Sequence, residues 1–323
     1  MKQKIQHKPK GMIIRNSIFY KILLKFKEPR QLIKSLPHYF LHATRSLWSD
    51  KLYLKMLYRI RMGKPLNLND PQTFTEKIQW LKLYNRKPEH TTMVDKNAVK
   101  DYVAKRIGEE YIIPTIGVWN RPEDIDFSTL PERFILKTTH GGGGGGISIC
   151  RGKATFNKEE ALAHLRQSLK QNIYSVYKEW PYKNVPHRII AEEYVEDTTL
   201  KELRDYKFYC FNGKCRCFKV DYDRFIEHHA NYYDLNCNIL PFGETAFPPQ
   251  YDKHIELPQN LNKMMELAEK LSEKEPFLRV DFYNVDGNIY FGELTFFPFS
   301  GLSKFTSEEW NKKLGEWIEL PLK

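Results

Sequence analysis

The sequence predicts an α+β protein of two lobes, in which helices pack on antiparallel sheets. Asn212-Gly213 and Asp286-Gly287 each lie between two extended, alternating segments, and such dipeptides are the strongest short-range signal for a β-hairpin. Six consecutive glycines, 141–146, lie between the β-like residues 134–137 and 147–149, which predicts a third hairpin with a flexible loop. With 323 residues, the chain is long enough to divide these hairpins between more than one lobe.

Helix signals lie between the hairpins. Thr73 begins a Thr-x-x-Glu capping box, which predicts the start of a helix. Thr92 is expected to cap a second helix that runs to Gly108. Apolar spacing predicts two further helices, one after the cap residue Asn157 and one over residues 261–272.

Positive charge is concentrated at the N-terminus. Residues 1–64 contain 16 Lys and Arg but 2 acids, whereas the rest of the chain contains 35 Lys and Arg and 38 Asp and Glu. Residues 12–64 are expected to be mostly helical, with breaks at Pro29 and Pro37. A basic amphipathic helix can lie on an anionic membrane surface, and it can equally pack on the main domain with its lysines exposed. Because the remainder is acidic, an extended basic groove is not expected, and neither is a nucleic acid partner.

Other features of the composition favour a cytoplasmic location. There is no run of about 18 apolar residues, so no membrane-spanning helix is expected. No small-residue cleavage site follows the basic N-terminus, so no signal peptide is expected. Five cysteines are an odd number in a large chain, which favours reduced thiols. Cys210, Cys215 and Cys217 lie close together, but they lack the two C-x-x-C knuckles of a zinc site, and metal binding by them is not expected.

The glycine run is the most informative segment. Lys137 ends the apolar strand before it, and Thr138-Thr139-His140 leads into the glycines. Glycine lets the backbone approach a ligand closely and point successive N–H groups at an anion, while a lysine supplies a point charge for phosphate. The pattern is not a Walker loop, in which Lys follows the glycines, and not a dinucleotide loop, which opens a helix. A phosphate-covering loop is therefore favoured over a flexible linker.

Two acidic residues near the C-terminus are candidates for binding a hard cation. Asp281 and Glu293 lie on consecutive alternating strands. A two-residue turn would place them on opposite faces, whereas a three-residue loop with Gly287 left-handed would set Arg279 opposite Glu293 and Asp281 diagonal to it. In the second geometry the two carboxylates can share Mg²⁺, with Thr295 next on the same face. A simple Arg279–Glu293 ion pair is the alternative, and the nearby phosphate loop favours magnesium.

These features together resemble the ATP-grasp superfamily, and more narrowly the TupA-like ATP-grasp proteins, which are associated with teichuronopeptide and surface-polysaccharide biosynthesis. The resemblance covers about residues 66–315 and is carried by segments 74–80, 95–96, 130–137, 190–194, 205–208, 279–281 and 291–296. It implies an ATP-grasp fold, with two α+β lobes whose antiparallel sheets clasp ATP, plus a helical basic N-terminal extension. The implied domains are the extension at 1–65, a helical pre-grasp segment at 66–113, a lid lobe with the Gly-rich loop at 114–195, and a C-terminal lobe with the metal site at 196–323.

The resemblance also implies a role for each matching residue. The implied ATP-binding residues are Lys96 and Lys137 at the phosphates, Gly141, Gly142, Gly143, Gly144, Gly145 and Gly146 over the triphosphate, Glu192, Glu193, Tyr194 and Val195 at an adenine-binding hinge, and Asp205 near the ribose. For His140, just before the glycines, two roles stay open, contact with the γ-phosphate or capping of the strand. The implied catalytic residues are Arg279, Arg224 and Lys207, and the implied magnesium ligands are Asp281, Glu293 and Thr295. Thr295 stands where the family's usual Glu-x-Asn motif has Asn, which leaves the number of metal ions open.

The implied activity is amide formation that depends on ATP and Mg²⁺. ATP phosphorylates a carboxylate to an acylphosphate, and an amine then displaces phosphate. The implied substrates are an acidic sugar or glycan carboxylate and an amino acid or amine, in capsule, teichuronopeptide or other surface-polysaccharide biosynthesis. The enzyme is then expected in the cytoplasm, with residues 1–65 free to contact the inner face of the membrane or an anionic glycan. Two alternatives are an ATP-dependent phosphotransferase acting on a glycan and a glycosyltransferase of the same pathway, although no Asp-x-Asp sugar-nucleotide site is evident.

Overall fold

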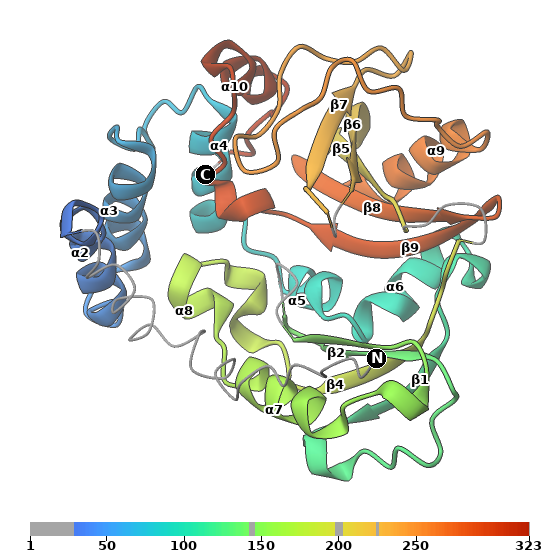
Figure 1. The fold of residues 1–323 in the computed structure, drawn as a ribbon. Helices are drawn as coiled ribbons and strands as arrows, with labels where there is room; N and C mark the ends of the chain where they lie inside the picture. The colour runs from blue at the N-terminus through green and yellow to red at the C-terminus, as the bar shows by residue number, and fades with distance from the viewer. Residues whose placement is uncertain (1–28, 142–145, 198–202, 224–225, 323) are drawn as a thin grey trace, which may run out of the picture. The chain divides into compact units, whose positions relative to one another are not determined.

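The computed structural model describes residues 29–141, 146–197, 203–223 and 226–322 (Figure 1). The chain divides into two compact units, Met1–Lys64 and Pro65–Lys323. Several residues with an implied role lie outside the described residues, namely Gly142, Gly143, Gly144, Gly145 and Arg224. The expected helical segment at residues 12–28 lies outside them too.

Two helices make up the described part of the first unit, α2 (Pro29–Ala43) and α3 (Asp50–Met62). The expected break at Pro37 is wrong, because α2 continues through that residue. Proline removes one backbone hydrogen bond from a helix, which bends it and costs stability but does not always end it. Pro29 stands at the first position of α2, where a missing N–H costs nothing.

Sheet A has four antiparallel strands, β1 (Thr115–Trp119), β2 (Phe134–Thr138), β3 (Ile147–Cys150) and β4 (Ile189–Glu193), in the order β1-β4-β2-β3. Helix α7 (Lys158–Leu169) packs on one face, where Phe134, Leu136 and Leu165 form a buried apolar cluster. Because side chains alternate along a strand, Lys137 points to the other face. The predicted glycine hairpin is therefore the β2–β3 connection.

Sheet B has five antiparallel strands, β5 (Asp205–Phe211), β6 (Lys214–Tyr222), β7 (His229–Tyr233), β8 (Phe277–Val285) and β9 (Asn288–Thr295), in the order β7-β6-β5-β8-β9. Its apolar face carries the paired residues Phe208 and Val280, and helix α9 (Leu261–Ser272) packs on the sheet. The opposite face carries the paired residues Lys207 and Asp281. The predicted Asn212-Gly213 hairpin is confirmed.

The helices before sheet A differ partly from expectation. The Thr73 capping box is confirmed and begins α4 (Phe74–Tyr84). The expected helix from Thr92 to Gly108 is instead two helices, α5 (Glu89–Val94) and α6 (Ala98–Ile107). Asp95 explains the break, because its Oδ1 accepts hydrogen bonds from the backbone N–H groups of Asn97 (2.8 Å) and Ala98 (3.3 Å) and so satisfies the start of α6.

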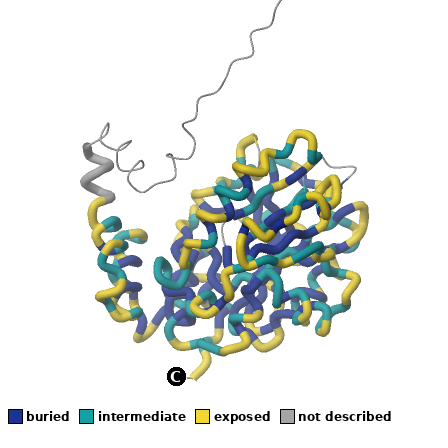
Figure 2. The backbone as a smooth tube through the Cα atoms, turned by 90° about the horizontal axis from the view of Figure 1, so that it is seen from below, coloured by how far each residue is buried: buried dark blue, intermediate teal, exposed yellow. Residues whose placement is uncertain are grey.

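The remaining helical elements are short. They are α8 (Ile173–Tyr177), α10 (Glu308–Glu316), η2 (Glu109–Tyr111), η3 (Pro122–Asp124), η4 (Lys153–Thr155), η5 (Trp180–Asn184) and η6 (Pro298–Gly301). Figure 2 shows the buried residues grouped toward the inside of the fold and the exposed residues toward its outside. Within the described part of the chain, no helix has both the length and the apolarity needed to cross a bilayer.

Candidate active site

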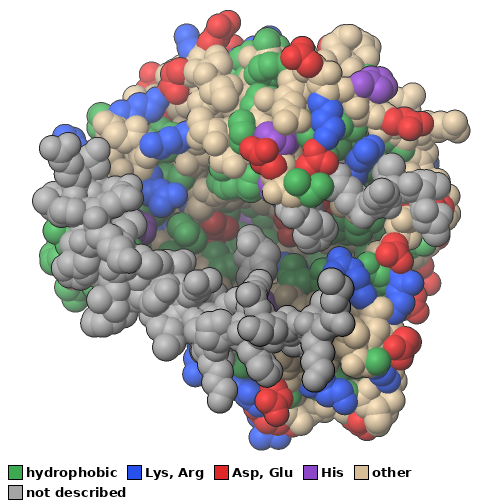
Figure 3. Space-filling view, in the orientation of Figure 1, with side chains coloured by type: hydrophobic (Ala, Val, Ile, Leu, Met, Phe, Trp, Pro, Cys, Tyr) green, Lys and Arg blue, Asp and Glu red, His purple; other side chains and the backbone are tan. Residues whose placement is uncertain are grey.

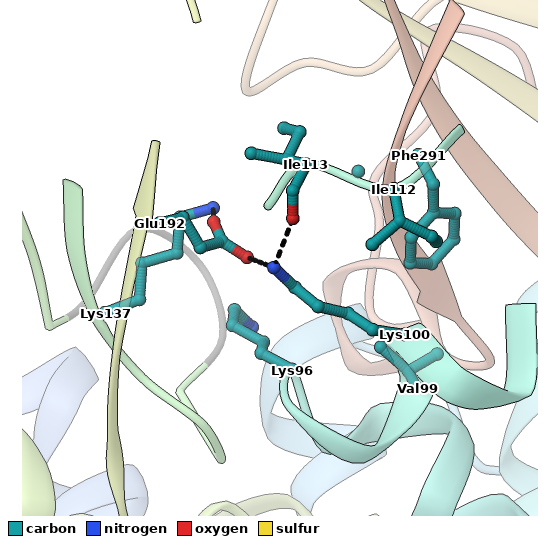
Figure 4. Close-up of a pocket in the computed structure, with 9 residues that line it drawn as sticks. Lys96, Val99, Lys100, Ile112, Ile113, Lys137, Glu192 and Phe291 are labelled. Carbon is teal, nitrogen blue, oxygen red and sulfur yellow. Dashed lines mark hydrogen bonds and ion pairs between the residues drawn. The ribbon is translucent and has the colours of Figure 1, made fainter. Parts of the chain in front are cut away.

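The sheet A side of the site is built around one carboxylate that contacts two lysines. Glu192 on β4 forms ion pairs with Lys137 of β2 and with Lys100 of α6, the latter at 2.8 Å. Figure 4 shows both lysine side chains directed at Glu192, with Lys96 beside them. Burial by itself would raise the pKa of Glu192, but the two lysines outweigh it and lower that pKa. Glu192 therefore remains ionised although its side chain is only 7% exposed.

Lys96 lies in the break between α5 and α6 and connects the glycine loop to sheet B. Its backbone N–H donates to the carbonyl of Thr139 (2.9 Å), and its Nζ donates to the carbonyl of Gly141 (2.5 Å). Burial lowers the pKa of Lys96, and the negative charge of Glu293 on β9 opposes this shift. The break that Asp95 creates thus places a lysine at the start of the glycine loop and within electrostatic reach of the acidic hairpin.

The Gly146 end of the glycine loop contacts side chains of α7, and the His140 end packs on His187. Gly146 has a φ of +79°, and a Cβ there would come within 2.2 Å of Ser168 Oγ, so only glycine fits. The backbone N–H of Gly146 donates to His164 Nε2 at 3.4 Å. His140, 1% exposed, stacks on His187 with ring centroids 3.7 Å apart, and burial lowers its pKa to about 4. His140 is therefore a neutral, packed residue at the base of the loop.

The β8–β9 hairpin brings Asp281 and Glu293 together by a route that differs from the expected one. Asp286 (φ 50°) and Gly287 (φ 83°) form a two-residue turn, so the three-residue loop is wrong. A β-bulge at Gly292 then shifts the register by one residue, and Asp281 pairs directly with Glu293. One extra residue reverses the face of every side chain beyond it, so the two acids share a face despite the short turn.

Arg279 lies between these two carboxylates. Its Nε and one terminal nitrogen donate to the two oxygens of Asp281 at 2.7 and 2.6 Å, and a terminal nitrogen donates to Glu293 Oε1 at 2.8 Å. Thr295 Oγ1 donates to the same Glu293 oxygen at 3.0 Å. In the strand register Arg279 lies opposite Thr295, so the expected position of Arg279 opposite Glu293 is wrong. The ion pair between Arg279 and Glu293, which is the alternative to a magnesium site, is nevertheless present.

Burial and neighbouring charges shift the pKa values of the two acids in opposite directions. Burial raises the pKa of Asp281 to about 6, although Arg279 and Lys207 oppose the shift. Burial would also raise the pKa of Glu293, but Lys96, Arg279 and Lys207 outweigh it and lower that pKa to about 2. Glu293 has a side chain that is 42% exposed, so it presents a charged oxygen pair to the site.

Further charged groups extend this row across sheet B. Lys207 Nζ lies 2.6 Å from Asp205, 2.7 Å from Asp221 and 3.8 Å from Asp281. Lys219 continues the row, at 3.5 Å from Asp221 and 2.8 Å from Glu244. The row comprises five carboxylates and three cationic groups, namely Asp205, Asp221, Glu244, Asp281 and Glu293 against Lys207, Lys219 and Arg279. It therefore carries two more negative than positive charges.

The donor set fits magnesium, which prefers oxygen ligands and needs only one or two carboxylates when phosphates supply the rest. Asp281, Glu293 and Thr295 supply carboxylate and hydroxyl oxygens on one face, and the negative surplus of the row favours a cation there. Among the described residues, no group of three or more His, Cys, Asp or Glu side chains is arranged as a self-sufficient metal cage. A metal ion at this position would therefore depend on ligands from a bound phosphate.

The expected hinge residues divide between the two surfaces of sheet A. Glu192 faces the site, while the next residue, Glu193, is exposed. Tyr194 lies under Arg133, whose guanidinium is 4.5 Å from the ring centroid, and its hydroxyl accepts from Arg151 at 3.2 Å. Val195 follows outside the strand and is half-buried.

Two basic residues on the sheet A side of the site escaped the sequence analysis, as did Lys219, Asp221 and Glu244 in the row on sheet B. Lys100 follows Lys96 by four residues and lines the same small cavity of about 20 Å³, together with Lys137, Glu192 and Gly292. Arg188, just before β4, pairs with Asp95 at 3.0 Å. The four-residue spacing of Lys96 and Lys100 could have indicated a shared site only if the start of a helix between them were known. Lysine and arginine thus outnumber acids on the sheet A side, the reverse of the sheet B side.

Comparisons with known proteins found one family and several solved structures that are similar to this chain. The sequence model described as TupA-like ATPgrasp matches residues 76–319. Among solved structures, a D-alanine–D-alanine ligase from Bacillus anthracis is similar at 20% identity (TM-score 0.38), covering 63% of this chain and 57% of that one. The Helicobacter pylori D-alanine–D-alanine ligase is similar at 14% identity (TM-score 0.41; 77% and 70% covered). A biotin carboxylase from Campylobacter jejuni is similar at 15% identity (TM-score 0.45; 85% and 60% covered).

These likenesses are partial. The chain spans a little over half the length of the Bacillus anthracis ligase, and TM-scores below 0.5 assign no residue role and no substrate. No curated protein matches the chain. The family match, by contrast, covers most of the chain and every part of the site described above.

Proposed function

The chain belongs to the TupA-like ATP-grasp family, and from this premise we propose that it binds ATP with magnesium between sheet A and sheet B. The observation that carries the proposal is the opposite charge surplus of the two sides. Cationic side chains outnumber acids beside sheet A, and carboxylates outnumber cations on sheet B. Lysines suit the phosphates of ATP and carboxylates suit its magnesium ion.

The residues divide the work of phosphoryl transfer. Lys96 and Lys137 are proposed to bind phosphate oxygens, and Arg279 to stabilise the phosphoryl group as it is transferred. Asp281 and Glu293, with Thr295 as a neutral oxygen donor, would hold Mg²⁺. When bound, this ion neutralises charge on the phosphates. The loop that begins at Gly141 and ends at Gly146 is proposed to close over the triphosphate and exclude water.

Three assignments from the family resemblance continue as proposals. Asp205 and Lys207 are proposed to lie near the ribose and the phosphates, with Arg224 as a second catalytic arginine. Glu193, Tyr194 and Val195 are proposed as the hinge that contacts adenine. Glu192 was expected in this hinge, but because its carboxylate contacts Lys100 and Lys137, we propose that it acts at the phosphate lysines instead. His140 is proposed to support the loop; its burial against His187 favours this role over direct phosphate contact.

We propose that the reaction is amide formation through an acylphosphate. A carboxylate oxygen of the acceptor attacks the γ-phosphorus, and the bond to ADP breaks. The nitrogen of an amine then attacks the acyl carbon, the C–O bond to phosphate breaks, and the nitrogen loses a proton. The products are an amide, ADP and phosphate. The association of the family with surface polysaccharides favours an acidic sugar as acceptor and an amino acid or amine as donor, acting in capsule or teichuronopeptide synthesis.

Product analysis tests this reaction. Purified protein, Mg·ATP and candidate pairs of uronate and amino acid are incubated, and phosphate, ADP and acceptor are quantified. A ligase releases phosphate when both the uronate and the amino acid are present, and it yields an amide. A phosphorylated glycan that persists would instead identify a phosphotransferase, and consumption of a sugar nucleotide would identify a glycosyltransferase. The Lys137→Ala variant serves as the inactive control.

We also propose that the first unit binds an anionic membrane surface. Leu36, Phe40 and Leu47 are 52%, 67% and 75% exposed, and they accompany the basic charge of residues 1–64. Charge alone fits a polyanionic glycan equally well, whereas exposed apolar side chains favour a bilayer. The full chain should co-sediment with phosphatidylglycerol vesicles but not with phosphatidylcholine vesicles, and Phe40→Ala with Leu47→Ala should weaken binding. Unchanged binding by this variant would favour a purely ionic contact.

A further inference from the structure

Lys137, the lysine best placed to bind phosphate, is already engaged in the structure. It forms an ion pair with Glu192, and its side chain is 16% exposed (Figure 4). The cavity that these residues line, about 20 Å³, has room for about one water molecule. A nucleotide phosphate that binds Lys137 therefore competes with Glu192 for the same ammonium group.

Separating Lys137 from Glu192 would normally be unfavourable. The side chain of Glu192 is 7% exposed, and a buried carboxylate that loses its only partner is strongly destabilised. Glu192 differs from that case because it has a second cation. Lys100 Nζ lies 2.8 Å from Glu192 Oε1, while Lys137 contacts the other oxygen, Oε2. Each lysine thus has an oxygen of its own, and one can leave without displacing the other.

Lys100 is fixed in a way that Lys137 is not. Its Nζ also donates to the carbonyl of Ile113 at 2.6 Å and to Thr115 Oγ1 at 2.8 Å. With Glu192 these make three acceptors for the three hydrogens of the ammonium group, so Lys100 has no N–H left for a phosphate. No such additional acceptor is recorded for Lys137 among the described residues. The two lysines therefore have different tasks.

We propose that Lys100 is a positioning residue that keeps the negative charge of Glu192 paired. Lys137 can then transfer from Glu192 to the phosphates of the incoming nucleotide. The inference rests on the proposed ATP site and goes beyond it, because it assigns the lysine that sequence analysis missed and explains why the site contains an acid among its lysines. Lys100 affects nucleotide binding through Glu192 and does not touch the nucleotide. Without Lys100, the Lys137–Glu192 pair becomes exclusive and competes with ATP.

The test is a double-mutant cycle with ATP binding as the readout. Affinity for ATP is measured by calorimetry, without magnesium, for wild type, Lys100→Met, Glu192→Gln and the double variant. Lys105→Met serves as the matched control, because Lys105 is an exposed lysine on the same helix. Lys100→Met is expected to weaken ATP binding at least tenfold. The double variant is expected to bind within about threefold of wild type, since Lys137 is then free of Glu192.

The outcomes separate the possible roles of Lys100. If Lys100 touched ATP or served only to hold β1 against α6, removing the Glu192 charge would not restore affinity, and a double variant as weak as Lys100→Met would overturn the proposal. Unchanged affinity in Lys100→Met would overturn it as well. Should Lys100→Met fold poorly, Lys100→Arg keeps the charge and is expected to bind ATP as wild type does, whereas Lys100→Gln is not. A wild-type protein that binds no ATP would overturn the proposed function itself.

Discussion

The sheet A side and the sheet B side of the site differ in how their charges are held. On sheet B, Arg279 and Lys207 each contact two or more carboxylates, and the row extends across β9, β8, β5 and β6 to Glu244. On sheet A, among the residues that the structure describes, Lys137 has one ion-pair partner and Lys96 Nζ donates to one backbone carbonyl at the glycine loop, whereas Lys100 has three acceptors. A multiply bonded charge is fixed in position, whereas a singly bonded one can change partners. The comparison indicates a preorganised cation side and an adaptable phosphate side.

The surface of the protein agrees with a local rather than a global charge separation. In Figure 3, Lys and Arg side chains are interspersed with Asp and Glu over the visible described surface. Within the second unit, the two signs of charge are segregated between the sheets, where the effective dielectric constant is low and each charge acts strongly. Such an arrangement favours recognition of one compact ligand with both phosphate and metal over binding of an extended polyanion.

The largest expected effect comes from removing the central cation of the fixed side. Arg279→Ala leaves Asp281 with Lys207 at 3.8 Å and Glu293 with the Thr295 hydroxyl at 3.0 Å, and breaking a buried pair typically costs about 3–5 kcal/mol. Urea unfolding should show this loss. Added Mg²⁺ should recover more stability in the variant than in wild type, because the two carboxylates are then free to bind it. A variant as stable as wild type would mean that the row is not preorganised.

The next largest effect distinguishes the phosphate side from the cation side by their responses to ATP and to Mg²⁺. Lys137→Ala should reduce stabilisation by ATP both with and without Mg²⁺, whereas Glu293→Ala should remove mainly the part that Mg²⁺ adds. Ligand at about 100 times Kd stabilises a fold by about 2.7 kcal/mol, so thermal unfolding resolves the difference. The Lys105→Met variant should behave as wild type. Equal responses of the two variants to Mg²⁺ would contradict the division into a phosphate side and a cation side.

The sequence was sufficient to predict the hairpins and the Thr73 cap, because turn dipeptides and caps are local signals. It was not sufficient for the register of β8 and β9. The two-residue turn at 286 and 287 would place Asp281 and Glu293 on opposite faces, and the bulge at Gly292 brings them back to one face. A glycine inside a strand does not reveal by itself whether it forms a bulge.

Partners distant in sequence were also beyond local signals. Lys100 is 92 residues from Glu192, and its role depends on the helix break that Asp95 creates. Pro37 failed as a helix breaker for the opposite reason: a strong local signal was overridden by the surrounding helix. The residue types of the site were thus predictable, whereas their pairing required the fold.

The smallest expected effect tests whether the register of the acidic hairpin is set at the bulge rather than at the turn. Gly287 has a φ of +83° and open space around its Cα, so Gly287→Ala should cost only the left-handed strain, about 1–2 kcal/mol. Gly287→Asn should cost less, because Asn tolerates this conformation. Neither variant should alter the stabilisation that Mg²⁺ adds to ATP.

Gly292→Ala provides the contrast at the bulge. Its Cβ would lie 3.1 Å from the carbonyl oxygen of Asp281, so the backbone must give by a few tenths of an ångström where Asp281 and Glu293 pair. This variant should therefore reduce the magnesium-dependent part of the thermal shift even if its stability loss is no greater than that of Gly287→Ala. If instead Gly287→Ala affected magnesium and Gly292→Ala did not, the turn would control the register, and the fixed geometry of the cation side would have to be attributed to the ion pairs of Arg279 alone.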